Sequence, residues 1–359
     1  MPLVNITKIM EKFVNVPIFK KQHTMLDSLN LATPKRKLLL RASTLFSNLN
    51  TGTEKRMKPF NLPPISTEKK RIRIPMPRFS KRPHGSVSFY AGCTFAGNLG
   101  KNEDRVVMIN TSLKSSGRTC SYFAIFDGFS GSFSCNFLRD NLHLLIFKHP
   151  LIESNTGKAI SDSFEEAERL ILAQGSIKSR KSGACALVSV IIGKYIYLAN
   201  LGSTRSYLSS LKGFEKTIIT KEHFLYDEEE RNRVISNGGE IFEIEGSLRV
   251  KPGNLNIGRC FGCGEAKGTN AVTAVPDIKS SKIRKKMDFL LLTSDGIWTV
   301  LNKHEVINTI WAKLDKKQGT QLEKVSAAVK SLLKKSLKND SNDNISAILI
   351  GFPNLPLLI

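Results

Sequence analysis

The sequence lacks an apolar run of the roughly 18–20 residues that a membrane-spanning helix needs. Its most apolar stretch, 186–201, is interrupted by Lys194. The first residues, MPLVNITKIMEKF, contain no continuous apolar segment of the kind found in secretory signals. Arginine is scarce there, which argues against a mitochondrial transit peptide without excluding it. We therefore expect an intracellular protein, cytoplasmic or nuclear, with no transmembrane segment.

Cysteine is also sparse, with 6 residues in a chain of 359. Without a secretory signal, such cysteines are typical of reduced intracellular thiols. Cys260 and Cys263 form a lone CxxC pair, and a zinc site would need a second pair of ligands at matching spacing. We interpret all six as structural thiols; they are Cys93, Cys120, Cys135, Cys185, Cys260 and Cys263.

Acidic residues are few, at 31 Asp and Glu against 54 Lys and Arg, which gives a net charge of +23. Residues 1–84 carry 18 basic and 4 acidic residues, a net of +14, together with several prolines. Like charge and proline disfavour a packed core, so we predict a basic, partly disordered extension over 1–84 and a folded domain over 85–354. The extension has three interpretations: a solvated arm, a nuclear-targeting or acidic-partner patch, or a contact with nucleic acid or anionic lipid. Aromatics are too rare among its basic residues to form a clear nucleic-acid motif.

From about residue 85 the pattern alternates between strands and helices. Strands come in hairpins and helices come in pairs, so we predict an α+β sandwich of antiparallel sheets and not a doubly wound parallel sheet. Predicted strands are 87–94, 105–110, 121–127, 184–192, 195–200, 287–295 and 344–352. Predicted helices are 133–148, 163–173, 226–236, 303–314 and 322–337.

Three aspartates lie at strand ends. Asp127 and Asp295 each close an apolar strand and precede glycine, and Asp343 comes just before the last strand. In an antiparallel sheet such ends are neighbours, so the three carboxylates can meet at one rim. They would repel one another unless a cation neutralised them, and hard oxygen ligands suit Mg²⁺ or Mn²⁺. The carbonyl of Gly128 is free to join them, and Glu103 and Asp104 form a further acidic pair. A single Asp-Gly would be read as an ordinary turn.

The order of these segments resembles the type-2C, metal-dependent serine/threonine protein phosphatases, with the closest similarity to 2C-like domain proteins that have a degenerate active site. The matching segments are GNLGKNEDR (97–105), YFAIFDGFSG (122–131), YLANLGSTRSYL (197–208), ITKEH (219–223), LNIGRCFG (255–262), VPDI (275–278), DFLLLTSDGIW (288–298) and SNDNISAILI (341–350).

The resemblance implies a four-layer αββα sandwich of two antiparallel sheets flanked by helix pairs. It also implies two Mn²⁺ or Mg²⁺ ions that activate a water for attack on a phosphoester. In the family pattern, Asp127 bridges both ions, the carbonyl of Gly128 binds one, and Asp295 and Asp343 complete the other. The family pattern further implies that Glu103 and Asp104 hold metal-bound waters.

Four positions depart from the family pattern. Leu99 stands where the family has its phosphate-binding arginine, and Phe129 stands where it has the histidine that protonates the leaving group. Ser203 replaces an aspartate associated with a third, weaker metal, and Cys263 replaces the aspartate of a later motif. An isobutyl group cannot neutralise a phosphate dianion, and a phenyl ring has no proton to give.

Nothing else in the sequence clearly supplies the lost groups. If 99–103 were extended, Lys101 would face the same side as Leu99 and could approach a phosphate. We interpret His143 and His223 as structural or solvated, because no spacing argument brings either to the site.

Two function hypotheses follow. The first is a weak or inactive phosphatase that keeps its metal ligands and serves as a phosphoprotein-binding or scaffold module. The second is a working Mn²⁺/Mg²⁺-dependent phosphoserine/phosphothreonine phosphatase. A third, an adaptor acting through the tail on nucleic acid or membrane, needs only residues 1–84.

Overall fold

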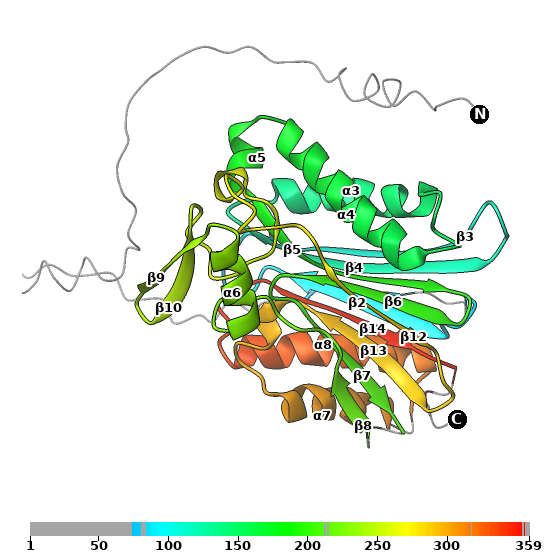
Figure 1. The fold of residues 1–359 in the computed structure, drawn as a ribbon. Coiled ribbons are helices and arrows are strands. Elements are labelled where there is room, and N and C mark those ends of the chain that lie inside the picture. The colour runs from blue at the N-terminus through cyan, green and yellow to red at the C-terminus, as the bar shows by residue number, and fades with distance from the viewer. Residues whose placement is uncertain are drawn as a thin grey trace, which may run out of the picture. The chain divides into compact units, whose positions relative to one another are not determined.

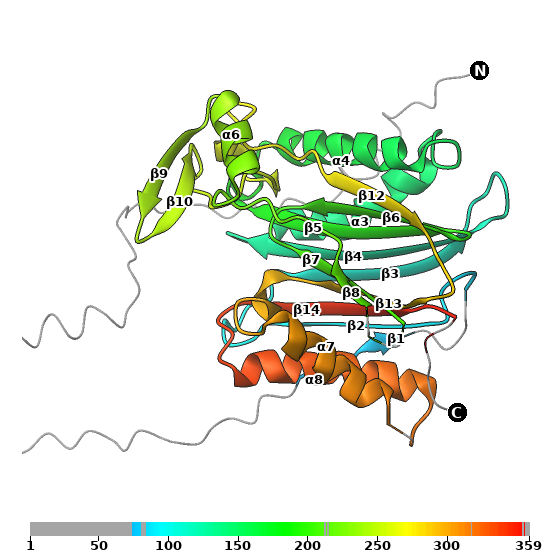
Figure 2. The ribbon, with the colours of Figure 1, turned by 60° about the horizontal axis from the view of Figure 1, so that its bottom comes forward.

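Two antiparallel β-sheets lie face to face between pairs of helices in the computed structural model (Figures 1 and 2). The structure describes residues 74–79, 84–211, 213, 215–316, 318–353 and 355. Most of the predicted basic extension, 1–73 and 80–83, lies outside the described residues. None of the described helices is both long enough and apolar enough to cross a bilayer.

The first sheet follows the order β1-β2-β14-β13-β7-β8, and all its neighbours are antiparallel. Its strands are β1 (Arg78–Phe79), β2 (Phe89–Phe95), β14 (Ile345–Gly351), β13 (Met287–Thr293), β7 (Arg205–Ser210) and β8 (Glu215–Ile218). β1 lies within the segment predicted as an extension, so this sheet begins before residue 85.

The second sheet follows the order β12-β6-β5-β4-β3, and β11 also pairs with β5. Its strands are β12 (Asp277–Lys282), β6 (Tyr195–Leu201), β5 (Gly183–Ile192), β4 (Thr119–Phe129), β3 (Arg105–Ser112) and β11 (Phe261–Gly262). A separate hairpin joins β9 (Glu240–Ile244) to β10 (Ser247–Lys251).

The helices cover the outer faces of the sheets. α3 (Phe133–Lys148) and α4 (Thr156–Ala173) pack on the second sheet, while α7 (Lys303–Leu314) and α8 (Gln321–Lys338) pack on the first (Figure 2). The short α5 (Ile177–Lys181) follows α4, and α6 (Glu228–Ser236) lies beside the β9–β10 hairpin (Figure 1). Reciprocal capping boxes fix the starts of α7 and α8, at Asn302 with Glu305 and at Thr320 with Glu323.

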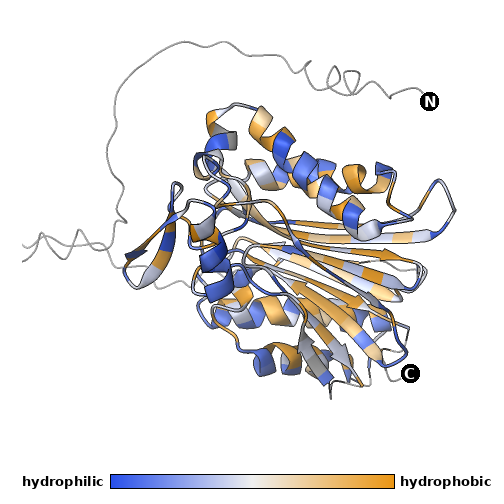
Figure 3. Cartoon of the chain, viewed as in Figure 1, coloured by the Kyte–Doolittle hydropathy of each residue, from blue (hydrophilic) through white to orange (hydrophobic). Residues whose placement is uncertain are grey.

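The core forms three apolar layers, one between the sheets and one beneath each helix pair (Figure 3). β4 shows how one sequence serves two layers, because successive side chains point to opposite faces of a strand. Tyr122, Ala124 and Phe126 pack toward α3 and α4, whereas Phe123 and Ile125 pack between the sheets. This double burial explains the nearly unbroken apolar run SYFAIF.

The predicted αββα sandwich is therefore confirmed. Helix α4 begins at Thr156, seven residues before the predicted start, because Asn155 caps its first turn by accepting a hydrogen bond from the Lys158 N–H. The β9–β10 hairpin and the edge strand β12 were not predicted. β12 carries no apolar alternation because most of its side chains face solvent.

Candidate functional site

The predicted aspartates do come together at one rim of the sandwich. Asp127 lies near the end of β4, Asp295 opens a short 3-10 helix, η2 (Asp295–Ile297), just after β13, and Asp343 precedes β14. The Asp295 N–H donates a hydrogen bond to Asp127 Oδ2 at 3.3 Å. The η2 backbone lies so close to the start of β14 that a Cβ on Gly296 would stand 3.3 Å from the Cβ of Asp343.

The second acidic pair borders the same rim. Asp104 is buried, and its Oδ2 accepts a hydrogen bond of 2.6 Å from Ser346 Oγ, while its Oδ1 has no hydrogen-bond partner among the described residues. Glu103 accepts a hydrogen bond from the Gly131 N–H at 2.9 Å. Its own N–H donates to Asn344 Oδ1 at 2.7 Å, which ties the pair to the residue after Asp343.

Glycine at position 128 is required by this packing. A Cβ there would lie 2.6 Å from the Glu103 carbonyl oxygen and 2.9 Å from Cys135 Sγ, closer than side-chain carbons approach such atoms. The absent side chain therefore lets the Glu103 backbone lie against β4 beside Asp127. Gly128 thus lies at the rim, where its lack of a side chain allows β4 and the Glu103 backbone to pack closely.

Burial raises the pKa values of all four aspartates, and neighbouring carboxylates add to the rise at Asp127, Asp104 and Asp343. Burial first, and then the charges of Asp295, Asp104 and Asp343, hold the pKa of Asp127 well above its ordinary range. Burial and the neighbouring aspartates raise the pKa of Asp104 to about 7, against the hydrogen bond from Ser346. Burial and the charge of Asp295 raise the pKa of Asp343 to about 6. Burial also raises the pKa of Asp295.

This cluster is suited to a hard divalent cation, although it is not a finished coordination shell. Among the described residues, no group of three or more His, Cys, Asp or Glu side chains is arranged to hold a metal ion. The donors are nevertheless carboxylate oxygens, and the buried Oδ1 atoms of Asp104 and Asp295 lack hydrogen-bond partners. Unpaired buried carboxylates are costly until a cation or a proton neutralises them. The donor set therefore fits Mg²⁺ or Mn²⁺ in its chemistry.

Leu99 lies in the loop between β2 and β3 and is 55% exposed. Gly97 and Gly100 flank it in left-handed conformations, and its N–H donates to the Ala96 carbonyl, so the loop turns there. The extended backbone on which the suggestion for Lys101 depends is not present, because 97–101 turns and bends. The loop thus presents an isobutyl group to solvent at the predicted phosphate-binding position.

Phe129 closes β4 and packs into a small apolar cluster between β5 and α6. It pairs with Gly183 across the sheet, and a Cβ on Gly183 would lie 2.1 Å from Phe129 Cζ. The ring therefore lies directly over the glycine. The aromatic side chain fills this place by packing and offers no proton.

The remaining predicted positions lie close by. Ser203 is buried, and its Oγ donates to Cys185 Sγ at 3.4 Å. Cys185 is the cross-strand neighbour of Asp127, a placement that the sequence analysis missed because no motif contains it. Cys263 adopts a left-handed conformation, and its N–H donates to the Ser182 carbonyl. All six cysteines are buried free thiols.

The two histidines considered in the sequence lie in other surroundings. His143 lies on α3 against Tyr122 and Phe147 in the outer apolar layer. His223 is buried, accepts a hydrogen bond from the Gly202 N–H through Nδ1, and faces Asp277 with Nε2 at 3.3 Å.

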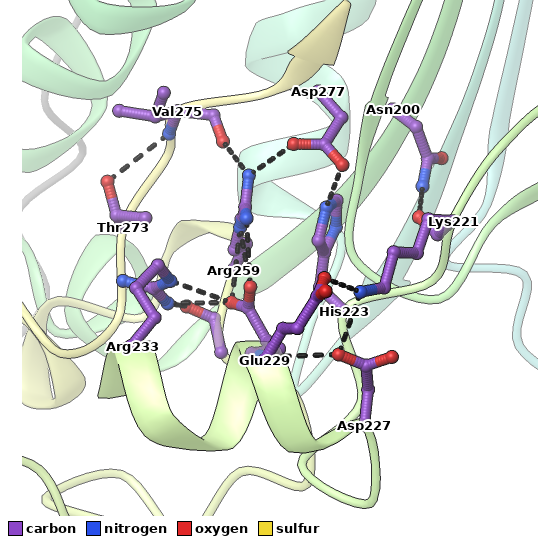
Figure 4. Close-up of polar contacts among 12 residues, drawn as sticks. Asn200, Lys221, His223, Asp227, Glu229, Arg233, Arg259, Thr273, Val275 and Asp277 are labelled. Atoms are coloured by element: carbon purple, nitrogen blue, oxygen red, sulfur yellow. Dashed lines mark hydrogen bonds and ion pairs between the residues drawn. The ribbon is translucent and has the colours of Figure 1, made fainter. Parts of the chain in front are cut away.

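A polar network continues from His223 toward α6 (Figure 4). Arg259 joins Asp277 to Glu230 of α6, with Nη1 2.7 Å from Asp277 Oδ1 and Nη2 2.8 Å from Glu230 Oε2. Arg233 contacts the same carboxylate at 2.7 Å. Because Gly202 precedes Ser203, the network connects α6 to the acidic rim. The order of these residues in the sequence gives no periodic signal for such an arrangement.

The comparisons with known proteins agree with this geometry. The family model described as protein phosphatase 2C matches residues 89–345, which is most of the chain and spans every carboxylate named above. The chain belongs to the protein phosphatase 2C family. Members of this family are typically metal-dependent, with Mn²⁺ or Mg²⁺.

Several relatives are plant proteins. "Probable protein phosphatase 2C 59" of Oryza sativa is 28% identical over 72% of this chain and 75% of its own length. "Probable protein phosphatase 2C 28" of Arabidopsis thaliana is 32% identical over 70% of this chain and 69% of its own length.

Two solved structures share the fold. The serine-threonine phosphatase 2C from Toxoplasma gondii has a TM-score of 0.66 at 18% identity and covers 78% of this chain and 98% of its own. A C. elegans sex determining protein has a TM-score of 0.64 at 25% identity and covers 73% of this chain and 64% of its own.

Proposed function

We propose that this 2C-family protein is a weak or inactive phosphatase that acts as a phosphoprotein-binding or scaffold module. The observation that carries the proposal is Phe129. Its ring packs over Gly183 at the position of the family's acid, while His143 contacts Tyr122 and Phe147 and His223 contacts Gly202 and Asp277. Loss of a general acid typically lowers a rate about 10²–10⁴-fold.

Leu99 supports the same conclusion. An exposed isobutyl group provides neither charge nor hydrogen bonds for a phosphate dianion, and the bent loop lacks the extended geometry from which a contribution by Lys101 was expected. Loss of a phosphate-binding arginine weakens electrostatic stabilisation in the transition state by a similar order. The two losses affect one reaction and need not multiply.

The second candidate is an active Mn²⁺/Mg²⁺-dependent phosphoserine/phosphothreonine phosphatase. The clustered carboxylates favour it, because the acidic residues of the site are present and close together. Asp127, Asp295 and Asp343, with the Gly128 carbonyl, would hold two ions, and Glu103 and Asp104 would orient waters around them. When bound, such ions supply Lewis acidity and lower the pKa of a water molecule. The chain's own side chains would then have to orient the phosphoester without the arginine and the acid.

Two substrates separate these candidates. We expect slow turnover, or none, of a phosphothreonine peptide with Mn²⁺. An activated aryl phosphate needs little protonation of its leaving group, so turnover of the aryl ester alone would identify the missing acid as the defect. Brisk hydrolysis of the peptide by the unaltered chain would overturn the proposal.

Restoring the lost groups provides the matched test. The double variant Leu99→Arg/Phe129→His should raise peptide hydrolysis by orders of magnitude over the unaltered chain. Adding Asp127→Asn to that variant should abolish the gain. An unchanged rate in the double variant would refute our explanation of the two departures.

Metal binding is tested separately from catalysis. Calorimetric titration of Mn²⁺ into the full chain should show binding that Asp127→Asn weakens strongly. An affinity equal in both proteins would exclude Asp127 from the metal site, whatever the activity.

We also propose an intracellular location, in cytoplasm or nucleus, which the six free thiols support. The partner is proposed to be a phosphoprotein or another protein bound by the domain, and the basic residues 1–84 would bind an acidic partner. Deleting 1–73 tests this second contact and leaves β1 in the sheet, so binding lost with that segment belongs to it.

A further inference from the structure

The end of the sandwich opposite the acidic rim carries a concentration of positive charge. Three turns meet there: 113–118 between β3 and β4, 193–194 between β5 and β6, and 283–286 between β12 and β13. Figures 1 and 2 both place these turns at the end of the sheets away from α6 and the β9–β10 hairpin. Asp127 lies eight residues along β4 from Thr119, about 26 Å at 3.3 Å per residue.

Hydrogen bonds join the three turns into one surface. The Ile283 N–H donates to the Lys194 carbonyl at 2.8 Å, and the Gly193 N–H donates to the Thr119 carbonyl at 3.0 Å. A Cβ on Gly193 would lie 3.5 Å from an Arg118 guanidinium nitrogen. The turns are therefore in direct contact and form one continuous surface.

This surface, which we call the basic end, has little compensating acid. None of the three turns contains an Asp or Glu. Six exposed cations on or beside the turns form no ion pair with any described residue; they are Lys114, Arg118, Lys194, Lys282, Arg284 and Lys285. Lys286 pairs with Glu215 at 2.8 Å. Glu153 lies at the edge of the surface, where it accepts a hydrogen bond from Ser115.

The shape of the basic end favours a flat partner. Its cations are exposed and stand on or beside turns at the ends of strands. A flat anionic surface can contact all three turns at once, whereas an extended acidic peptide would follow only part of them. Tyr195, next to Lys194, is 44% exposed, and tyrosine is well suited to the headgroup region of a membrane. A single exposed aromatic is too little for a base-stacking platform.

We propose that the basic end docks this protein on an anionic membrane surface, through the phosphate and carboxylate groups of lipid headgroups. The proposed attraction is electrostatic, between the exposed cations of the basic end and anionic headgroups. The acidic rim at the other end of the sheets would then face away from the membrane. The proposal does not depend on phosphatase activity.

The test uses the full chain and vesicles of phosphatidylcholine with about 30% phosphatidylserine. Each neutralised cation should weaken binding about fivefold, so Lys194→Gln/Arg284→Gln/Lys285→Gln should weaken it about 100-fold. The matched control, Lys316→Gln/Lys334→Gln/Lys338→Gln, removes the same charge from exposed lysines at the ends of α7 and α8 and should change binding less than fivefold. Binding should also fall as salt is raised.

Three results would overturn the proposal. The first is equal binding by the two triple variants, which would assign any attraction to net charge or to residues 1–84. The second is equal binding of the unaltered chain to vesicles with and without phosphatidylserine. The third is binding to an acidic peptide or an oligonucleotide that depends on the basic end, without binding to vesicles. Circular dichroism of both variants checks that the substitutions leave the fold intact.

Discussion

Replacing Glu230 by glutamine should destabilise the domain far more than an ordinary surface substitution. Glu230 is 3% exposed and accepts hydrogen bonds from two guanidinium groups, those of Arg233 at 2.7 Å and Arg259 at 2.8 Å. Burial raises the pKa of Glu230, but the two arginines outweigh it and leave the pKa below its ordinary value. Neutralising this carboxylate leaves two partly buried cations facing each other, which costs about 3–5 kcal/mol of unfolding free energy.

The measurement is urea unfolding of the full chain at pH 7, followed by circular dichroism. The matched control is Glu229→Gln on the same helix. Glu229 is 88% exposed and pairs with Lys221, so its loss should cost less than about 1 kcal/mol. Adding Arg259→Gln to Glu230→Gln should cost less than the sum of the two single changes, because the contact between Glu230 and Arg259 is lost only once.

The pH dependence has a definite sign. Because the folded pKa of Glu230 is lowered, its stabilisation is fully present above its unfolded pKa of about 4.3 and is lost as the pH falls through the lower folded value. The difference in unfolding free energy between Glu230→Gln and the unaltered chain should therefore become smaller in acid. The reasoning would be refuted if the substitutions at 229 and 230 lowered the free energy of unfolding equally, or if the loss caused by Glu230→Gln did not depend on pH.

Two further predictions concern the acidic rim. In EDTA, the chain should lose stability as the pH rises from about 4 to about 7. Burial raises the pKa values of Asp104 and Asp343, so over this range the folded state holds protons that the unfolded state has released. Thermal unfolding should show that the melting temperature falls less steeply with pH in Asp104→Asn, and an unchanged pH dependence would contradict this prediction. Asn344→Ala should lower the free energy of unfolding, measured in urea, by about 3 kcal/mol. The Asn344 side chain accepts a hydrogen bond from the Glu103 N–H and donates to the carbonyls of Ala96 and Lys101, and each bond contributes about 1 kcal/mol. A loss of less than about 1 kcal/mol would show that other contacts hold the loop.

The layered fold could be predicted from the sequence because buried faces of strands and helices require apolar residues at regular spacing. The continuous apolar run of β4 and the helical spacing of α3 both reflect buried faces, and α3 was predicted with its observed ends, Phe133 and Lys148. β12 leaves no such record, since it is an exposed edge strand. The β9–β10 hairpin turns at Glu245-Gly246, where both residues adopt left-handed conformations, and Glu-Gly is a weaker hairpin signal in a sequence than Asn-Gly or Asp-Gly.

The site was predictable in part for a different reason. Asp127, Asp295 and Asp343 mark strand ends. Antiparallel pairing of β13 with β14 brings Asp295 beside Asp343, whereas Asp127 belongs to β4 of the other sheet and meets them because the two sheets pack face to face. Contacts between side chains far apart in the sequence leave no such mark. The position of Cys185 beside Asp127 depends on the register of β5 against β4, and that register is set by the whole sheet.

Metal affinity and catalytic competence are separable in this protein. Asp127 and Asp104 are buried, neighbouring aspartates raise their pKa values, and the Oδ1 atoms of Asp104 and Asp295 have no hydrogen-bond partner among the described residues. A divalent cation would therefore stabilise the folded chain even if no substrate were ever hydrolysed. Catalysis additionally needs groups that act on the phosphoester, and those positions hold Leu99 and Phe129. A rise in melting temperature with Mn²⁺ would therefore support the metal site alone. Only the comparison of two leaving groups, together with the restored double variant, can decide between a scaffold and an enzyme.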